Sequence, residues 1–156
     1  MPAPHGLTIL SPHHDDAALS LSHALARWTT RRIPITVINI FTISSFAPFS
    51  DAADFDAVSR LRAAEDRAFF SNFPAVAVQN LDLPDAPLRL KIPVTAVRSN
   101  CPLCCADEEL AESLALRIRS IASDTLLLAP LALGDHIDHR LARAAAALAV
   151  ASHQLS

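Results

Sequence analysis

Two short clusters of histidine and aspartate lie near opposite ends of this chain. The first reads His-His-Asp-Asp at residues 13–16, and the second reads His-Ile-Asp-His at residues 136–139. Imidazole nitrogens and carboxylate oxygens are zinc ligands, and a catalytic zinc ion usually takes three of them and leaves its fourth position to water. The two clusters together therefore predict one zinc ion per chain.

The spacing within the clusters indicates which residues bind the metal. His13 and Asp16 are three residues apart, and across a turn from a strand into a helix this spacing can direct both side chains to one point. His139 could supply the third ligand. Asp15 must leave the backbone in another direction than Asp16, so it is free to accept a proton from the attacking water as a general base.

Two residues of the second cluster could assist the reaction. His136 is expected across the metal, where an imidazolium could stabilise a developing oxyanion or protonate the leaving amine. Asp138 could orient a neighbouring histidine by accepting a hydrogen bond from its ring. Asp15, His136 and Asp138 are therefore the predicted catalytic residues.

A structural role is the alternative for each cluster taken alone. Acidic residues are favoured at the start of a helix, as caps and as partners of the helix dipole, whatever the protein does. A single His-x-x-Asp or His-x-Asp-His is thus a weak sign of a metal site. The pair is a stronger sign, because a structural role would not require histidines in both clusters.

The elements between the clusters alternate between strands and helices. Short apolar runs, most of them with β-branched residues, predict strands at 7–10, 33–41, 75–78 and 125–130. Apolar residues at steps of three and four predict helices at about 16–31 and 106–121. A further helix is expected at about 57–70, and an alanine-rich segment predicts the last helix at 138–151. This order predicts an α/β fold, a Rossmann-like three-layer α/β/α sandwich with a mostly parallel sheet.

The strand order explains how the clusters could meet. Ligands of open parallel sheets bind beyond the carboxyl ends of the strands. The first cluster follows the first predicted strand and the second follows the fourth, so we expect both at one edge of the sheet. Residues 44–55 have no clear period and predict a long loop that borders this site.

Three cysteines, Cys101, Cys104 and Cys105, stand in one short segment. A Cys-x-x-Cys pair can bind metal or act in redox chemistry, but no second Cys or Cys/His pair lies at a suitable distance to complete a tetrahedral structural site. An ordinary loop with reduced thiols is the alternative, and it agrees with a reducing compartment.

Composition limits the classes of protein. The 156 residues fit a single domain over 1–156. Hydrophobic residues make up 51% and charged residues 19%, which suits a compact core rather than disorder. A formal net charge of -3 gives no basic surface for nucleic acid. No stretch approaches the roughly 20 apolar residues of a membrane span, so we expect a cytoplasmic protein.

Both clusters resemble motifs of one family. Residues 12–16, followed by Ala-Ala-Leu-Ser at 17–20, resemble the Pro/Ala-His-x-Asp-Asp signature of the zinc-dependent N-acetylglucosamine deacetylases of the PIG-L/LmbE type. Residues 135–140 resemble their downstream His-x-x-His element, and 37–42, 62–66 and 83–85 resemble further blocks in the same order. The resemblance implies one deacetylase domain over the whole chain.

The resemblance also implies roles for individual residues. Zinc would bind His13, Asp16 and His139, with Asp15 as the general base and His136 facing the oxyanion. Arg62 and Asp85 would lie near the substrate. An ordinary role is open for Arg62, because Arg62, Glu65 and Asp66 have the spacing of ion pairs on a helix surface.

This chain departs from the best-known members of the family at two positions. His14 stands where they have proline, and Ala17 stands where they have glutamate. We expect His14 to be a solvated neighbour of the site rather than a fourth ligand. Family members usually continue beyond the last helix, so the fold is expected to be shortened at its C-terminus, and a homo-oligomer could complete the sheet edge or the pocket.

The sequence leads to one main hypothesis. The chain is expected to be a metal-dependent amidohydrolase that removes an N-acetyl or other N-acyl group from an N-acetylglucosamine-type amino sugar or its conjugate, a small molecule. A truncated, non-catalytic relative that binds metal or sugar is the first alternative. A metal-dependent phosphoesterase is the second, although the sequence lacks a glycine-rich or arginine-rich phosphate cradle.

Overall fold

The computed structural model describes residues 5–51, 54–98 and 103–151. Its four strands form one parallel sheet in the order β3-β2-β1-β4. The strands are β1 (Leu7–Ser11), β2 (Ile35–Asn39), β3 (Val76–Asn80) and β4 (Leu126–Leu128). Each strand overlaps the apolar run that predicted it, and β4, at the edge of the sheet, is shorter than its run at 125–130.

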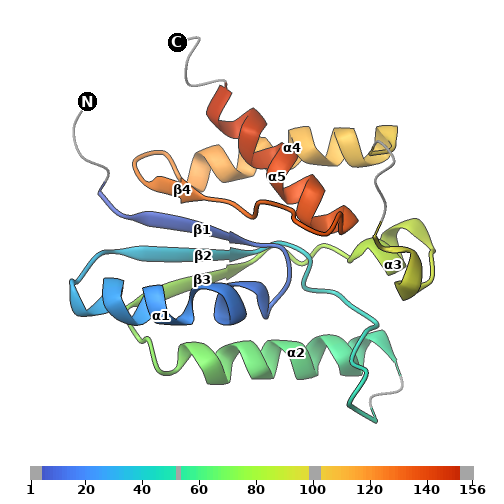
Figure 1. Ribbon diagram of the computed structural model, residues 1–156, viewed down its shortest axis with the longest axis horizontal. Coiled ribbons are helices and arrows are strands. Elements are labelled where there is room, and N and C mark those ends of the chain that lie inside the picture. Colours follow the sequence, from blue (N-terminus) through green and yellow to red (C-terminus); the bar gives the residue numbers. More distant parts are fainter. Residues whose placement is uncertain (1–4, 52–53, 99–102, 152–156) are drawn as a thin grey trace.

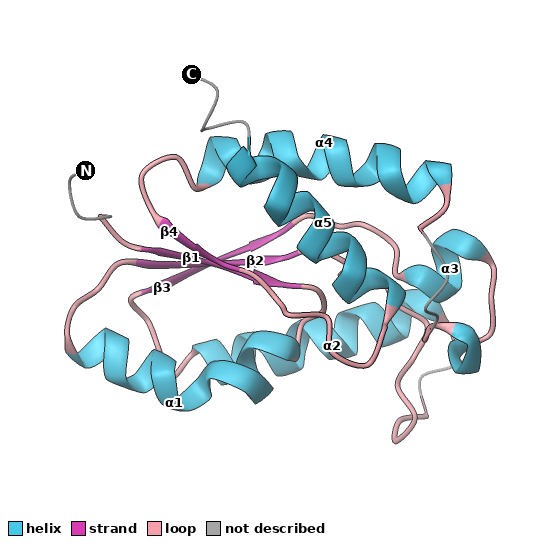
Figure 2. Cartoon of the chain, turned by 45° about the horizontal axis from the view of Figure 1, so that its top comes forward, coloured by secondary structure: helices cyan, strands magenta, loops and turns pink. Residues whose placement is uncertain are grey.

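Long helices cover both faces of the sheet (Figure 1, Figure 2). Helices α1 (Asp16–Thr30) and α2 (Phe55–Phe70) lie on one face, and α4 (Cys105–Ile121) and α5 (Ile137–Ala151) lie on the other. The predicted three-layer α/β fold is confirmed. None of the helices in the described part of the chain is long and apolar enough to cross a membrane.

The central strands separate two apolar clusters. All residues of β1 are buried, as expected of a strand that is covered on both faces. Because side chains alternate along a strand, Ile9 belongs to the cluster with α1 and α2, whereas Leu10 belongs to the cluster with α4 and α5. Val37 and Ile38 of β2 divide in the same way. The sheet is therefore held from both sides.

Two short helical segments are not predicted by the sequence. These are α3 (Ala86–Leu90) and the 3-10 helix η1 (Val94–Ala96). Asp85 caps α3, because its Oδ1 accepts a hydrogen bond from the N–H of Leu88 at 3.3 Å. Both segments are too short for an apolar period to indicate them. They lie beyond the carboxyl ends of the strands (Figure 1).

Of the clustered cysteines, Cys104 and Cys105 are free and exposed. They stand at the start of α4. Cys101 lies outside the described residues. A metal or redox role for this segment stays a prediction.

Two leucines of α4 test how the layer of α4 and α5 packs on the sheet. Leu114 is 1% exposed and packs in the cluster with α5, whereas Leu116 is 61% exposed. Leu114→Ala is expected to lower the free energy of unfolding by about 2–5 kcal/mol, because it leaves a cavity in the core. Leu116→Ala should change this free energy by less than about 0.5 kcal/mol. Urea denaturation measures both, and equal losses would contradict the packing.

Candidate metal centre

The two histidine and aspartate clusters meet at the carboxyl ends of β1 and β4. These strands are neighbours in the sheet. From β1 the chain turns into α1 on one face, and from β4 it continues to α5 on the other face (Figure 1). Such a switch point between neighbouring parallel strands is where open α/β sheets bind ligands. The sheet thus places the clusters as the sequence predicts.

Hydrogen bonds within the first turn fix the direction of its side chains. The hydroxyl of Ser11 donates to the carbonyl of His13 at 2.6 Å and accepts from the N–H of Ala17 at 3.1 Å. The N–H of His13 donates to Oδ2 of Asp16 at 2.8 Å. The turn from β1 into α1 is therefore ordered by its own polar groups.

The three predicted metal ligands converge on one point. Nδ1 of His13 lies 3.2 Å from Oδ2 of Asp16, and that oxygen lies 3.3 Å from Nε2 of His139. Zinc bonds of about 2.0–2.1 Å at tetrahedral angles would separate neighbouring ligand atoms by about 3.3 Å. Both distances to Asp16 match this value, and the three ligand atoms lie within 4.8 Å of one another. His13, Asp16 and His139 could therefore hold a zinc ion with little rearrangement.

A second group of possible ligands overlaps the first. His13, His136 and Asp138 also bring ligand atoms within 4.8 Å of one another. However, both oxygens of Asp138 have partners: Oδ2 lies 3.0 Å from Nε2 of His13 and accepts from the N–H of Ala86 at 2.9 Å, and Oδ1 accepts from Arg89 at 3.0 Å. With no exposed surface, Asp138 is placed to orient His13 rather than to touch a ligand in the cavity.

Charge in the metal-free site concentrates on His13. Burial lowers the pKa of His13, but hydrogen bonds to Asp138 and Asp16 outweigh burial and raise it to about 10. Burial raises the pKa of Asp16, but hydrogen bonds from His13 and His139 lower it well below its usual range. The site is therefore built around a positive charge, which a metal cation would supply in place of the proton.

His136 has a different environment. Its Nδ1 accepts a hydrogen bond from the N–H of Asp138 at 3.2 Å, so in the neutral ring Nε2 carries the proton. Burial and the charge of His13 lower the pKa of His136 to about 4. The sequence predicts an imidazolium here, whereas these surroundings favour a neutral ring, and a metal cation nearby would favour it further.

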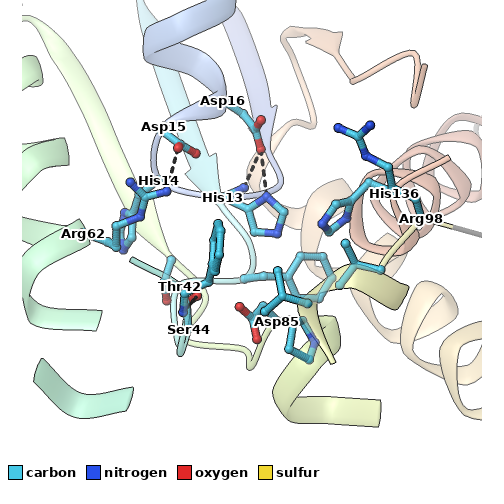
Figure 3. A pocket seen from close by; sticks show the side chains of 15 residues that line it. His13, His14, Asp15, Asp16, Thr42, Ser44, Arg62, Asp85, Arg98 and His136 are labelled. Atoms are coloured by element: carbon cyan, nitrogen blue, oxygen red, sulfur yellow. Dashed lines mark hydrogen bonds and ion pairs between the residues drawn. The ribbon is translucent and has the colours of Figure 1, made fainter. Parts of the chain in front are cut away.

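Asp15 and Arg62 form an ion pair beside this centre (Figure 3). Nη2 of Arg62 lies 2.7 Å from Oδ2 of Asp15, and Nη1 lies 3.1 Å from Oε2 of Glu65. The surface pair predicted for Arg62 and Glu65 is therefore present, and Arg62 also reaches the site. Asp15 diverges from Asp16, as expected of neighbouring residues at the start of a helix.

A cavity of about 430 Å³ opens beside the centre (Figure 3). It exposes His13, Asp15 and His136 to one space, together with apolar side chains such as Val97. The sequence analysis missed the remaining polar lining: Thr42, Ser44 and Arg98. Thr42 ends the block at 37–42 and Ser44 begins the loop predicted to border the site, but no motif singles out either side chain or that of Arg98.

Asp85 lines this cavity, and it is also a structural residue. It caps α3 and is buried. Burial raises the pKa of its carboxyl group, opposed by hydrogen bonds from Ser44 and the backbone of Leu88. The side chain of Asp85 thus connects the wall of the cavity to α3.

Two expectations about the surroundings of the site are wrong. His14 is not solvated: it is 6% exposed, and its Nδ1 lies 3.3 Å from Nδ2 of Asn39 and 3.6 Å from Oδ2 of Asp66. Asp66 is likewise buried and does not form a surface pair. Asn39 ends β2 and Asp66 belongs to α2, so only the folded chain brings these polar partners together.

Comparison with known proteins finds one family that matches nearly the whole chain. The sequence profile of the PIG-L family, described as GlcNAc-PI de-N-acetylase, matches residues 8–150. No match was found among curated proteins.

Solved structures share the fold. A deacetylase–teicoplanin complex from the biosynthesis pathway of teicoplanin is 27% identical, with a TM-score of 0.75 over 95% of this chain and 66% of that chain. The zinc-inhibited form of the teicoplanin deacetylase Orf2 is 26% identical, with a TM-score of 0.73 over 95% of this chain and 64% of that chain. The present chain thus spans less than two thirds of the length of these structures.

A more distant neighbour has another activity. The 4-carboxy-2-hydroxymuconate hydratase GalB of Pseudomonas putida KT2440 is 16% identical, with a TM-score of 0.61 over 96% of this chain and 55% of that chain. At this identity the likeness shows the fold alone. The chemistry must therefore be argued from the residues of the site.

The charge on His13 has a measurable consequence for the metal-free protein. Its pKa rises from 6.5 to about 10 on folding, so its contribution to stability is complete below pH 6.5 and is lost as the pH rises towards 10. In the presence of a chelator, the free energy of unfolding of the wild type should fall across this window. His13→Gln should lack this part of the decrease, and identical pH profiles in urea denaturation would contradict the charge assignment.

Proposed function

Because this chain belongs to the PIG-L family, described as GlcNAc-PI de-N-acetylase, we propose that it is a zinc-dependent amidohydrolase. Its substrate would be an N-acetylated or N-acylated amino sugar of the N-acetylglucosamine type, or a conjugate of one. The observation that carries the proposal is the convergence of His13, Asp16 and His139, whose ligand atoms lie within 4.8 Å of one another. Asp15 and His136 border the same cavity, where a substrate could reach them.

The ligands of the proposed zinc ion are Nδ1 of His13, a carboxylate oxygen of Asp16 and Nε2 of His139. A zinc ion bound there supplies Lewis-acid chemistry, which lowers the pKa of water to about 7 and polarises a carbonyl oxygen. The donor set suits this ion, because two imidazoles and one carboxylate are common ligands of catalytic zinc.

Asp15 is the proposed general base. Arg62 holds one of its oxygens at 2.7 Å, which fixes the carboxylate and leaves the other oxygen to accept a proton from the attacking water. The oxygen of this water then forms a bond to the amide carbon. When the carbon–nitrogen bond breaks, Asp15 can pass the proton to the leaving nitrogen, so the products are an amine and a carboxylate.

His136 is the proposed donor to the oxyanion. Its Nδ1 is occupied by the N–H of Asp138, so the neutral ring carries its proton on Nε2. A preorganised N–H donor stabilises negative charge as it develops on the carbonyl oxygen. Because the pKa of His136 is lowered to about 4, we assign the proton for the amine to Asp15 rather than to an imidazolium.

The cavity suits a small polar substrate with an apolar part. Its volume of about 430 Å³ falls in the range of small-molecule sites. We assign Arg62 and Asp85 to contacts with the sugar, because both line the cavity. A phosphoesterase is less well supported, because Asp15 and Glu65 already balance the positive charge of Arg62 that a phosphate would need. Arg98 lies on the other side of the cavity (Figure 3).

Two neighbouring aspartates test this assignment with matched substitutions. Asp15→Asn is expected to keep zinc and to lower kcat by about 10²–10⁴-fold, because the general base is lost. Asp16→Asn should lose zinc as well as activity. Zinc analysis and acetate release from a panel of N-acetylglucosaminyl compounds measure both properties.

Each outcome bears on a separate part of the proposal. Full activity in Asp15→Asn would exclude Asp15 as the base, and full zinc content in Asp16→Asn would exclude Asp16 as a ligand. If the wild type bound zinc but released no acetate from any compound, the non-catalytic alternative would be favoured.

A further inference from the structure

We propose that Arg89 is a positioning residue of the metal centre, which holds His13 in its ligand orientation by fixing the carboxylate of Asp138. Arg89 does not line the main cavity, so it would act through Asp138 and not on the substrate. The inference rests on the proposed metal site. It goes beyond that site by assigning a function to α3 and to the first turn of α4.

The guanidinium of Arg89 bridges two aspartates from different helices. Its Nη1 donates to Oδ1 of Asp138 in α5 at 3.0 Å. Its Nε donates to Oδ1 of Asp107 in α4 at 3.0 Å, and Nη2 lies 2.9 Å from the same oxygen. Nη1 also donates to the carbonyl of Pro84 at 3.2 Å. One planar group thus joins α3, α4 and α5.

Burial makes this bridge strong and directional. Asp107 and Asp138 are both buried, and the side chain of Arg89 is 14% exposed. The guanidinium carbon also lies 5.0 Å from the ring centroid of Phe41, a cation–π distance. A carboxylate removed from water needs a charged or hydrogen-bonding partner. Arg89 provides that partner for Asp107 and for Asp138 at the same time.

The position of Asp138 in turn determines which atom of His13 faces the metal site. Oδ2 of Asp138 lies 3.0 Å from Nε2 of His13, which leaves Nδ1 towards Asp16 at 3.2 Å. A carboxylate on the second ring nitrogen is a common way to orient a histidine ligand, and its loss weakens metal binding. Because Arg89 holds the other oxygen of Asp138, a change at Arg89 should reach His13.

Lysine could not replace Arg89 in this arrangement. The guanidinium presents its donors in a fixed plane, so Nε and Nη1 can donate to two different carboxylates, those of Asp107 and Asp138. An ammonium group has no such fork. The geometry therefore predicts that charge alone is not sufficient at this position.

The experiment compares zinc affinity in metal-free full-length variants by competition with a chelator. Arg89→Met is expected to weaken zinc affinity by about 10–100-fold, the range seen when groups that orient metal ligands are removed. With cobalt as a probe, its absorption spectrum should also change, because the ring of His13 is no longer fixed. An affinity within about two-fold of the wild type would overturn the proposal.

A control separates positioning from general destabilisation. Ile118 is fully buried in the apolar cluster between α4 and α5, and its side chain has no polar atom that could bond to Arg89 or Asp138. Ile118→Val should therefore lower thermal stability and leave zinc affinity within about two-fold. A comparable loss of affinity in Ile118→Val would show that the effect of Arg89→Met is only structural, and would overturn the proposal.

A second variant covers the case in which Arg89→Met does not fold. Arg89→Lys keeps the charge, and it is expected to bind zinc at least about five-fold more weakly than the wild type. Wild-type affinity in Arg89→Lys would overturn the inference while leaving the metal site intact. A wild type that binds no zinc would instead overturn the proposed function, and the inference with it.

Discussion

The hydrogen bond between His13 and Asp138 is the interaction on which the site depends. It joins residues 125 positions apart in the chain and connects the turn after β1 to the first turn of α5. Asp138 can serve as a buried partner only because Arg89 and the N–H of Ala86 satisfy its oxygens. The ligands lie in two short segments, but their arrangement therefore depends on contacts among the turn after β1, α3 and α5.

Electrostatics favours a cation at this place. His13 lies between the carboxylates of Asp16 and Asp138, and in the metal-free protein its proton supplies the positive charge, with a pKa near 10. Zinc would replace that proton, so binding should release it. The neighbouring His136 stays neutral by burial and by repulsion from this charge. The same arrangement thus prepares both a cation site and a neutral hydrogen-bond donor beside it.

The sequence predicts the parts of the molecule that local patterns determine. The strands β1 and β2 are apolar runs because both faces are covered, and α1 and α4 carry regular apolar stripes. The two clusters can be predicted because each combines metal-ligand residue types and follows a predicted strand. In contrast, the burial of His14 depends on Asn39 and Asp66, and the bridge of Arg89 depends on residues 18 and 49 positions away. Contacts of this kind exist only in the folded chain, and no spacing in the sequence indicates them.

The central claim is that one zinc ion binds His13, Asp16 and His139. Anomalous X-ray diffraction at the zinc absorption edge, on crystals of the zinc-loaded protein, tests it most directly. The account predicts a single strong peak per chain, within bonding distance of Nδ1 of His13, a carboxylate oxygen of Asp16 and Nε2 of His139. A peak coordinated instead by Nε2 of His13, His136 and Asp138, or no peak in this region, would contradict it.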